Sequence, residues 1–197
     1  MKSLKLIATT CCIGVAAMAF SANAVPINGS ATGLTTPDVI IDFEAGSLPN
    51  ATVVTNQFSG ITFGTNYNLF TGGAAPNISG RFLGDVGSTG PGSIFFDNDA
   101  SDAGFFFRTN TTTTTFTALL DGVLVESFAA STSLSNSSNF YGFTDIVFDE
   151  IQISVAVGGY NLDGLQFSDA AVSEPGSLVV FGLGLIGLGA IRRRRMI

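Results

Sequence analysis

Carboxylates are the side chains of this sequence best able to carry acid–base chemistry. The 197 residues contain fifteen Asp and Glu, no His and two Cys, Cys11 and Cys12, both close to the N-terminus. Without His, the chain offers neither a Ser-His-Asp triad nor a His-ligated metal centre. A glycosidase needs only two carboxylates flanking the scissile bond, so the composition permits that chemistry. Solvated surface carboxylates are commoner than catalytic ones, and we expect a protein that is not an enzyme.

Aromatic side chains offer a second kind of chemistry, stacking against sugar rings. The chain has eighteen Phe, three Tyr and no Trp. Runs such as Phe105–Phe107 would place alternate rings in the core of a strand-built domain, and we expect most Phe there. A phenol offers both an apolar face and a hydrogen-bonding group, which makes the tyrosines the better carbohydrate candidates. These are Tyr67, Tyr141 and Tyr160.

The charge is unevenly distributed along the chain. Six of the eight basic residues lie near the termini, so residues 25–175 hold two arginines against fifteen carboxylates, a net charge of −13. Such a surface disfavours nucleic acid, because phosphate binding depends on Lys and Arg. It would attract divalent cations, although the same charge also keeps a protein in solution. The acidic stretch 97–102 is no EF-hand, since Asp102 stands where the loop needs Gly.

The elements that position these side chains are predicted to be strands. Asp121-Gly122 between two apolar segments predicts a hairpin with a type I′ turn. Counting outward from a two-residue turn, the expected pairs are Leu120 with Val123, Ala118 with Val125 and Phe116 with Ser127.

The other expected strands are short and separated by Gly, Asn and Ser. They are residues 39–43, 52–58, 61–63, 93–96, 104–108, 146–157 and 160–167. The apolar alternation slips between Phe148 and Ile151, as a β-bulge requires. Residues 97–102 would then be a hairpin loop, and Ser131–Asn139 a flexible loop. The fold class is therefore all-β, an antiparallel β-sandwich, as a single domain over residues 25–171.

The N-terminus has the pattern of a secretory signal peptide. Lys2 and Lys5 form the basic region, Leu6–Phe20 the apolar region, and Ala22 and Ala24 flank Asn23 in an A-x-A cleavage site. Cleavage after Ala24 removes residues 1–24, a signal helix, together with both cysteines. The mature chain would then be exported and would have to be stable without disulfides.

The other end of the chain has three parts in a fixed order. An apolar segment, residues 177–191, is followed directly by four arginines, and an acidic-proline pair precedes it. The apolar run Leu178–Ile191 spans only about 21 Å as a helix, against about 30 Å for the hydrocarbon core. Four adjacent arginines, however, hold a terminus in the cytoplasm. We expect a short transmembrane helix with a basic membrane stop formed by Arg192, Arg193, Arg194 and Arg195.

This three-part order resembles the PEP-CTERM sorting tail of Gram-negative bacteria. The motif residues would be Val172, Ser173, Glu174 and Pro175, with Ser173 in place of the first Pro of the family's Val-Pro-Glu-Pro. The resemblance implies recognition by the membrane protease-transpeptidase called exosortase. It also implies brief anchoring in the inner membrane, with the N-terminal end of the helix periplasmic, and then delivery to the cell surface or extracellular matrix.

The segments 41–44, 57–63 and 161–167 are similar to jelly-roll ectodomains and to carbohydrate-binding modules of that architecture. Such modules pair their first and last strands and often hold a structural Ca²⁺ there. The resemblance therefore suggests Asp42 or Glu44 together with Asp163 as Ca²⁺ ligands, and Ca²⁺ prefers such oxygen ligands. Carboxylates on terminal strands that simply face solvent are the alternative.

Three functions remain open from the sequence. The leading interpretation is a surface or exopolysaccharide-associated protein whose jelly-roll-like domain is a non-catalytic module that binds polysaccharide. A carboxylate-only glycan hydrolase on the same scaffold is the second. An ice-binding adhesin is the third, although the run Thr111–Thr115 alone does not make the flat, repeated Thr array that ice binding needs.

Overall fold

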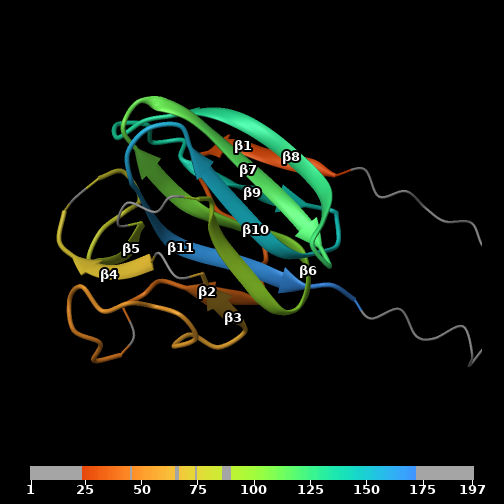
Figure 1. Cartoon of the computed structure of the whole chain (residues 1–197), viewed down its shortest axis with the longest axis horizontal. Coiled ribbons are helices and arrows are strands. Elements are labelled where there is room, and N and C mark those ends of the chain that lie inside the picture. The colour runs from red at the N-terminus through yellow and green to blue at the C-terminus, as the bar shows by residue number, and fades with distance from the viewer. Residues whose placement is uncertain (1–23, 45, 65–66, 74, 86–89, 172–197) are drawn as a thin grey trace, which may run out of the picture.

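The computed structural model describes residues 24–44, 46–64, 67–73, 75–85 and 90–171, and among these it contains eleven strands and no helix. The signal segment and the sorting tail lie outside these residues. Figure 1 shows the strands in chain order. They are β1 (Val25–Ser30), β2 (Val39–Ile41), β3 (Ile61–Phe63), β4 (Tyr67–Thr71), β5 (Arg81–Asp85), β6 (Gly92–Thr109), β7 (Thr112–Leu120), β8 (Val123–Thr132), β9 (Phe140–Thr144), β10 (Phe148–Val155) and β11 (Tyr160–Asp169).

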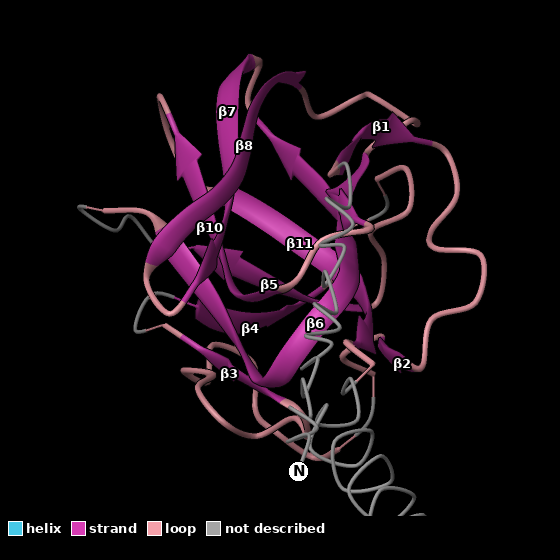
Figure 2. Cartoon of the chain, turned by 90° about the vertical axis from the view of Figure 1, so that its right-hand side faces the viewer, coloured by secondary structure: helices cyan, strands magenta, loops and turns pink. Residues whose placement is uncertain are grey.

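The described strands form one antiparallel sheet in the order β4-β5-β11-β6-β10-β7-β8, with β1, β2, β3 and β9 attached at its sides. Strand β6 is 18 residues long and joins the two halves of the sheet. Its first part pairs with β3 and β10, and its second part pairs with β9 and β11. The sheet bends around its core, as Figure 2 shows from the side. The predicted all-β antiparallel class is confirmed.

Aromatic rings fill the space between the two halves. Phe116 of β7 stacks on Tyr141 of β9, with ring centroids 5.0 Å apart and planes 11° apart. Phe128 of β8 contacts Phe143 of β9 at 5.3 Å. Because β9 pairs with neither β7 nor β8, these contacts cross the core. Most Phe side chains are core residues, as predicted, and such pairs add to the area that the rings bury.

The predicted hairpin is present, but the predicted register of its two strands is partly wrong. Asp121 and Gly122 have positive φ angles of 52° and 75°, and Leu120 faces Val123 as expected. A bulge between Ala118 and Leu119 then shifts the pairing by one residue, so that Phe116 faces Phe128 and not Ser127. The physical reason is burial, since the shift turns a ring and not a hydroxyl toward the core.

The slip in the apolar pattern near Phe148 is a real irregularity. The pairing of β10 with β6 changes register between Phe148 and Glu150, and Glu150 and Ile151 are buried in succession. This confirms the predicted bulge.

Two other expectations are wrong. The acidic stretch Asp97–Asp102 is not a hairpin loop but the middle of β6. Ala100 and Ala103 point into the core, which the small side chains permit, while Asp97 and Asp99 are exposed. The expected strand 52–58 is reduced to a single bridge between Val53 and Asn68.

Within the described residues, the structure has no helix with the length and apolarity that crossing a membrane requires. The predicted transmembrane segment, residues 177–191, lies outside them.

Candidate functional site

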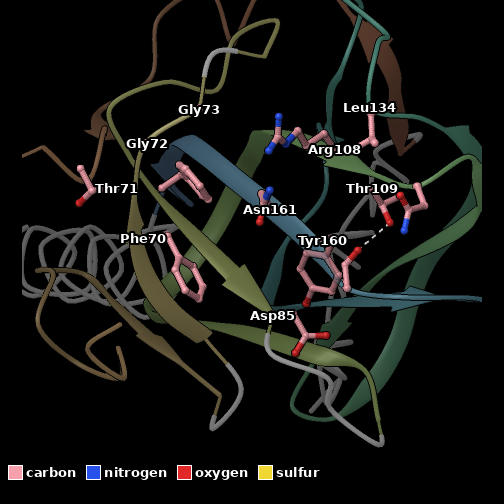
Figure 3. Close-up of a pocket in the computed structure, with 13 residues that line it drawn as sticks. Phe70, Thr71, Gly72, Gly73, Asp85, Arg108, Thr109, Leu134, Tyr160 and Asn161 are labelled. Carbon is pink, nitrogen blue, oxygen red and sulfur yellow. Dashed lines mark hydrogen bonds between the residues drawn. The ribbon is translucent and has the colours of Figure 1, made fainter. Parts of the chain in front are cut away.

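An open hollow of about 560 Å³ lies where β4, β5 and the ends of β6 and β11 meet. Figure 3 shows its lining side chains. Phe70 and Phe82 form an apolar part of its wall, with ring centroids 6.1 Å apart. They share a face because they are partners across β4 and β5. Gly84 makes room for this wall, since a Cβ there would lie only 2.8 Å from the Phe70 ring.

The polar centre of the hollow is the pair Arg108 and Asn161, which are register partners on β6 and β11. With its amide oxygen turned toward Arg108, Asn161 accepts hydrogen bonds from Nε at 3.0 Å and Nη2 at 3.1 Å. Its amide nitrogen then donates to the carbonyl oxygen of Tyr160 at 3.2 Å. The guanidinium also lies over the Phe82 ring, 6.0 Å from its centroid. Arg108 is therefore held on two sides, and its donors are preorganised.

Beneath the hollow, the hydroxyl groups of Tyr67 and Tyr160 form a hydrogen bond 2.9 Å long. Burial raises the pKa of both phenols well above the ordinary value, so both stay neutral at physiological pH. The nearby hydroxyl of Thr109 donates to the carbonyl oxygen of Gly159 at 2.8 Å. These bonds fix the ends of β6 and β11 that carry Arg108 and Asn161.

The expected role of the three tyrosines needs correction. Tyr67, Tyr141 and Tyr160 are 0%, 2% and 4% exposed, so none of them offers an open ring face to a sugar. Tyr141 is covered by Phe116 and Phe107. Burying an aromatic ring of this size is favourable once its hydroxyl group has a hydrogen-bond partner inside the protein, because the hydroxyl then no longer needs water. Of the three, Tyr160 is the one that lines the hollow.

The carboxylates predicted to bind Ca²⁺ lie in one neighbourhood. Asp163 is 7% exposed, and its two oxygens accept the N–H of Ser79 at 3.2 Å and of Gly164 at 2.7 Å. Burial, and then the negative charges of Glu44 and Asp42, raise the pKa of Asp163 to about 7 against the opposing effect of these two bonds.

Glu44 and Asp42 also accept hydrogen bonds from the backbone. Glu44 accepts the N–H of Arg81 at 2.7 Å, and Asp42 accepts the N–H of Glu44 at 3.1 Å. Among the residues that the structure describes, no group of three or more His, Cys, Asp or Glu side chains is placed to hold a metal. A Ca²⁺ shell takes six to eight oxygens, so backbone carbonyl oxygens or water would have to supply the further ligands. Ca²⁺ binding by Asp42, Glu44 and Asp163 stays a prediction.

A second hollow, of about 500 Å³, contains the carboxylates of Asp102 and Asp145. Both oxygens of Asp102 already accept hydrogen bonds, from the N–H of Asp145 at 3.2 Å and from the hydroxyl of Ser101 at 2.7 Å. These bonds hold the turn before β10. They give Asp102 a structural role, and the Arg108 hollow is the better candidate for a binding site.

Sequence reasoning missed the residues that build the Arg108 hollow. Arg108, Asn161, Phe70 and Phe82 come from four strands, and their spacing in the chain shows no motif. One signal was available, because Arg108 is one of only two arginines in an otherwise acidic stretch of 151 residues, 25–175. A single basic side chain in such an acidic sequence indicates a specific interaction.

Comparison with known proteins bears on the C-terminal end of the chain. A family model described as the PEP-CTERM protein-sorting motif matches residues 171–195. The chain carries a PEP-CTERM sorting motif. The predicted motif residues 172–175 and arginines 192–195 all lie within the match. No curated protein matches the sequence.

Solved structures with a similar fold include two carbohydrate-binding structures and one viral protein. CsCBM6-3 from Clostridium stercorarium, in complex with cellobiose, is 17% identical with a TM-score of 0.38 over 60% of this chain and 92% of that one. A family 6 carbohydrate-binding module is 18% identical with a TM-score of 0.36, and the match covers 74% of this chain and 100% of that module. The enzymatically active domain of tailspike protein 4 from bacteriophage CBA120 is 21% identical with a TM-score of 0.35. The match covers 60% of this chain and 21% of the tailspike chain. At these TM-scores the likeness assigns no ligand to this chain.

Proposed function

We propose that this chain is an exported surface protein, processed at its sorting motif by an exosortase-type membrane protease, whose β domain is a non-catalytic polysaccharide-binding module. The observation that carries the proposal is the match of residues 171–195 to the PEP-CTERM sorting motif. In this scheme the tail anchors the protein in the inner membrane for a time. Processing then delivers the domain to the cell surface or the exopolysaccharide.

The hollow at Arg108 supports glycan binding by its chemistry. A sugar presents an apolar C–H face and a rim of hydroxyl groups. The half-buried ring of Phe70 provides an apolar surface, and the fixed polar groups of Arg108 and Asn161 lie beside it. Sites for small ligands combine such an apolar wall with a few well-placed polar groups.

The carboxylates support a non-catalytic role. Asp85 is the one carboxylate among the described residues that line this hollow. Hydrolysis of a glycoside requires two, about 5–9.5 Å apart across the bond. We therefore place the glycan hydrolase second.

The test is binding by the full-length chain, purified in mild detergent, to a panel of soluble polysaccharides by affinity electrophoresis. Phe70→Ala removes the exposed part of the apolar wall and should abolish retardation. Phe95→Ala is the matched control, because Phe95 is an exposed ring outside the hollow. Release of reducing ends is measured in the same samples and should not rise above background.

Two results would overturn the proposal. The domain is not this module if no polysaccharide is retarded, or if Phe70→Ala binds as the native chain does. Release of reducing ends that is lost on changing one carboxylate would support the hydrolase.

A further inference from the structure

The two arginines of residues 25–175 have different surroundings. The Arg81 guanidinium donates to two backbone carbonyl oxygens of the loop 46–48 and so fixes that loop. The partners of the Arg108 guanidinium in the described residues are the amide oxygen of Asn161 and the ring of Phe82, and no carboxylate is among them. Arg81 is structural, whereas the charge of Arg108 is not neutralised by these partners.

A guanidinium has five N–H donors in a planar fork. Asn161 accepts one from Nε and one from Nη2, which leaves three for a ligand. The side chain lies at one end of the hollow, and Asp85 lies at the other (Figure 3). Gly73 borders the Arg108 end, and the side chain of Arg108 is half-buried, so part of it stays accessible from the hollow.

We propose that the hollow selects an acidic sugar, with the carboxylate of a uronic acid paired to Arg108 while the sugar ring packs against Phe70. The inference rests on the proposed glycan-binding function of this site and names its ligand class. A planar carboxylate matches the fork of a guanidinium in a bidentate pair, which is stronger than a neutral hydrogen bond. Because Asn161 and Phe82 already hold Arg108 in place, the pair costs little side-chain entropy.

The acidic surface of the protein does not exclude an acidic ligand. Residues 25–175 carry a net charge of −13, which repels an anionic polymer at a distance. At 0.1 M salt this repulsion is screened beyond about 10 Å, while a partly buried pair is screened much less. Long-range repulsion therefore slows the encounter, and the contact with Arg108 determines which sugar stays bound.

The experiment compares two forms of one oligosaccharide, tetragalacturonate and its fully methyl-esterified form, by isothermal titration of the full-length chain in mild detergent. Esterification removes the charge and keeps the ring. The native chain should bind the acid about tenfold or more tightly than the ester, as expected for a hydrogen bond to a charged group. Arg108→Gln should remove this preference, and Arg108→Lys, with the charge but not the fork, should keep part of it.

Arg81→Gln is the matched control, because it changes the net charge equally outside the hollow and should keep the preference. A melting curve establishes that each variant is folded. If Arg108→Gln does not fold, the reduced preference of Arg108→Lys for the acid is the test. Equal affinity of the native chain for acid and ester, or an undiminished preference in the folded Arg108 variant, would overturn the inference. The proposed function would survive that result as long as either form binds and Phe70→Ala abolishes binding. If neither form nor any neutral glycan binds, both fail.

Discussion

Asp163 is the residue whose protonation should affect stability most clearly. Its pKa is raised from 3.8 to about 7 in the folded state, so folded Asp163 holds a proton that the unfolded chain releases. The contribution of this protonation to the free energy of unfolding is fully present below about pH 4 and is lost as pH rises through about 7. Without metal, we expect the melting temperature of the native chain, relative to that of Asp163→Asn, to fall between pH 5 and pH 8. Parallel curves for the two proteins would contradict this.

The same melting curves, measured with millimolar Ca²⁺ and compared with those measured in a chelator, test the predicted binding of Ca²⁺. A cation bound by Asp42, Glu44 and Asp163 stabilises the ionised carboxylates, so at pH 8 it should raise the melting temperature of the native chain but not of Asp163→Asn. An unchanged curve at millimolar Ca²⁺ would end the Ca²⁺ hypothesis.

At the level of single residues, the sequence predicted the carboxylate neighbourhood better than the binding hollow. Asp42 and Glu44 lie near enough to Asp163 for their negative charges to raise its pKa. Tyr67 was predicted to be a ligand platform and is a core residue, because its hydroxyl finds a partner in Tyr160 and no longer needs water. Such a partnership joins strands 93 residues apart, and no local pattern reveals it.

Among the elements, β7 is the one whose core ring should matter most. Phe116 is fully buried and lies 5.0–5.3 Å from the rings of Tyr141, Phe128 and Phe107. Phe116→Ala should cost about 3–5 kcal/mol, from lost burial plus a cavity. Phe95→Ala, at a ring 41% exposed, should cost much less, near the roughly 0.5 kcal/mol of surface changes. Urea unfolding followed by circular dichroism measures both, and similar costs would contradict the assignment of Phe116 to the core.

Local patterns predicted the elements that depend on local chemistry. The Asp121-Gly122 turn, strand β3 and the bulge near Phe148 were all readable, since each follows from turn residues or alternation. The length of β6 was not readable. Its acidic middle looks like a loop, and its pairing with β10 and β11 makes it a strand. Likewise, the Thr run has no uniform face, because Thr114 points inward and bonds to Thr132 at 2.7 Å.

On the scale of the whole molecule, β11 separates the hollow from the tail. Tyr160, at its start, lines the hollow, and Asp169, nine residues later, leads toward the sorting motif. At about 3.3 Å per residue, these ends are about 30 Å apart. In Figure 1, β4 and β5 lie at the left and β11 ends at the right. The hollow and the strand end that leads toward the sorting motif therefore lie at opposite ends of β11.

The last prediction concerns the tail, which lies outside the described residues. Four arginines are costly to carry across a membrane, so Arg192–Arg195 should hold the C-terminal end in the cytoplasm. Gly182, Gly184, Gly187 and Gly189 in a short apolar run would allow close packing against a membrane partner and would make the proposed anchor weak and temporary. Replacing the four arginines with Ser should weaken retention in the inner membrane, measured by fractionation.

Changing Glu174 and Pro175 to Ala is the complementary variant. It alters the motif just before the apolar run and leaves the run and the arginines intact, so insertion should persist while processing stops. The two variants thus separate anchoring from cleavage, with the mass of the cell-surface protein reporting cleavage. Mature surface protein that still carries Arg192–Arg195 would show that the tail is not removed. The order we infer, in which the helix inserts, the arginines stop transfer and a protease then cuts near Glu174 and Pro175, would then be wrong at its last step.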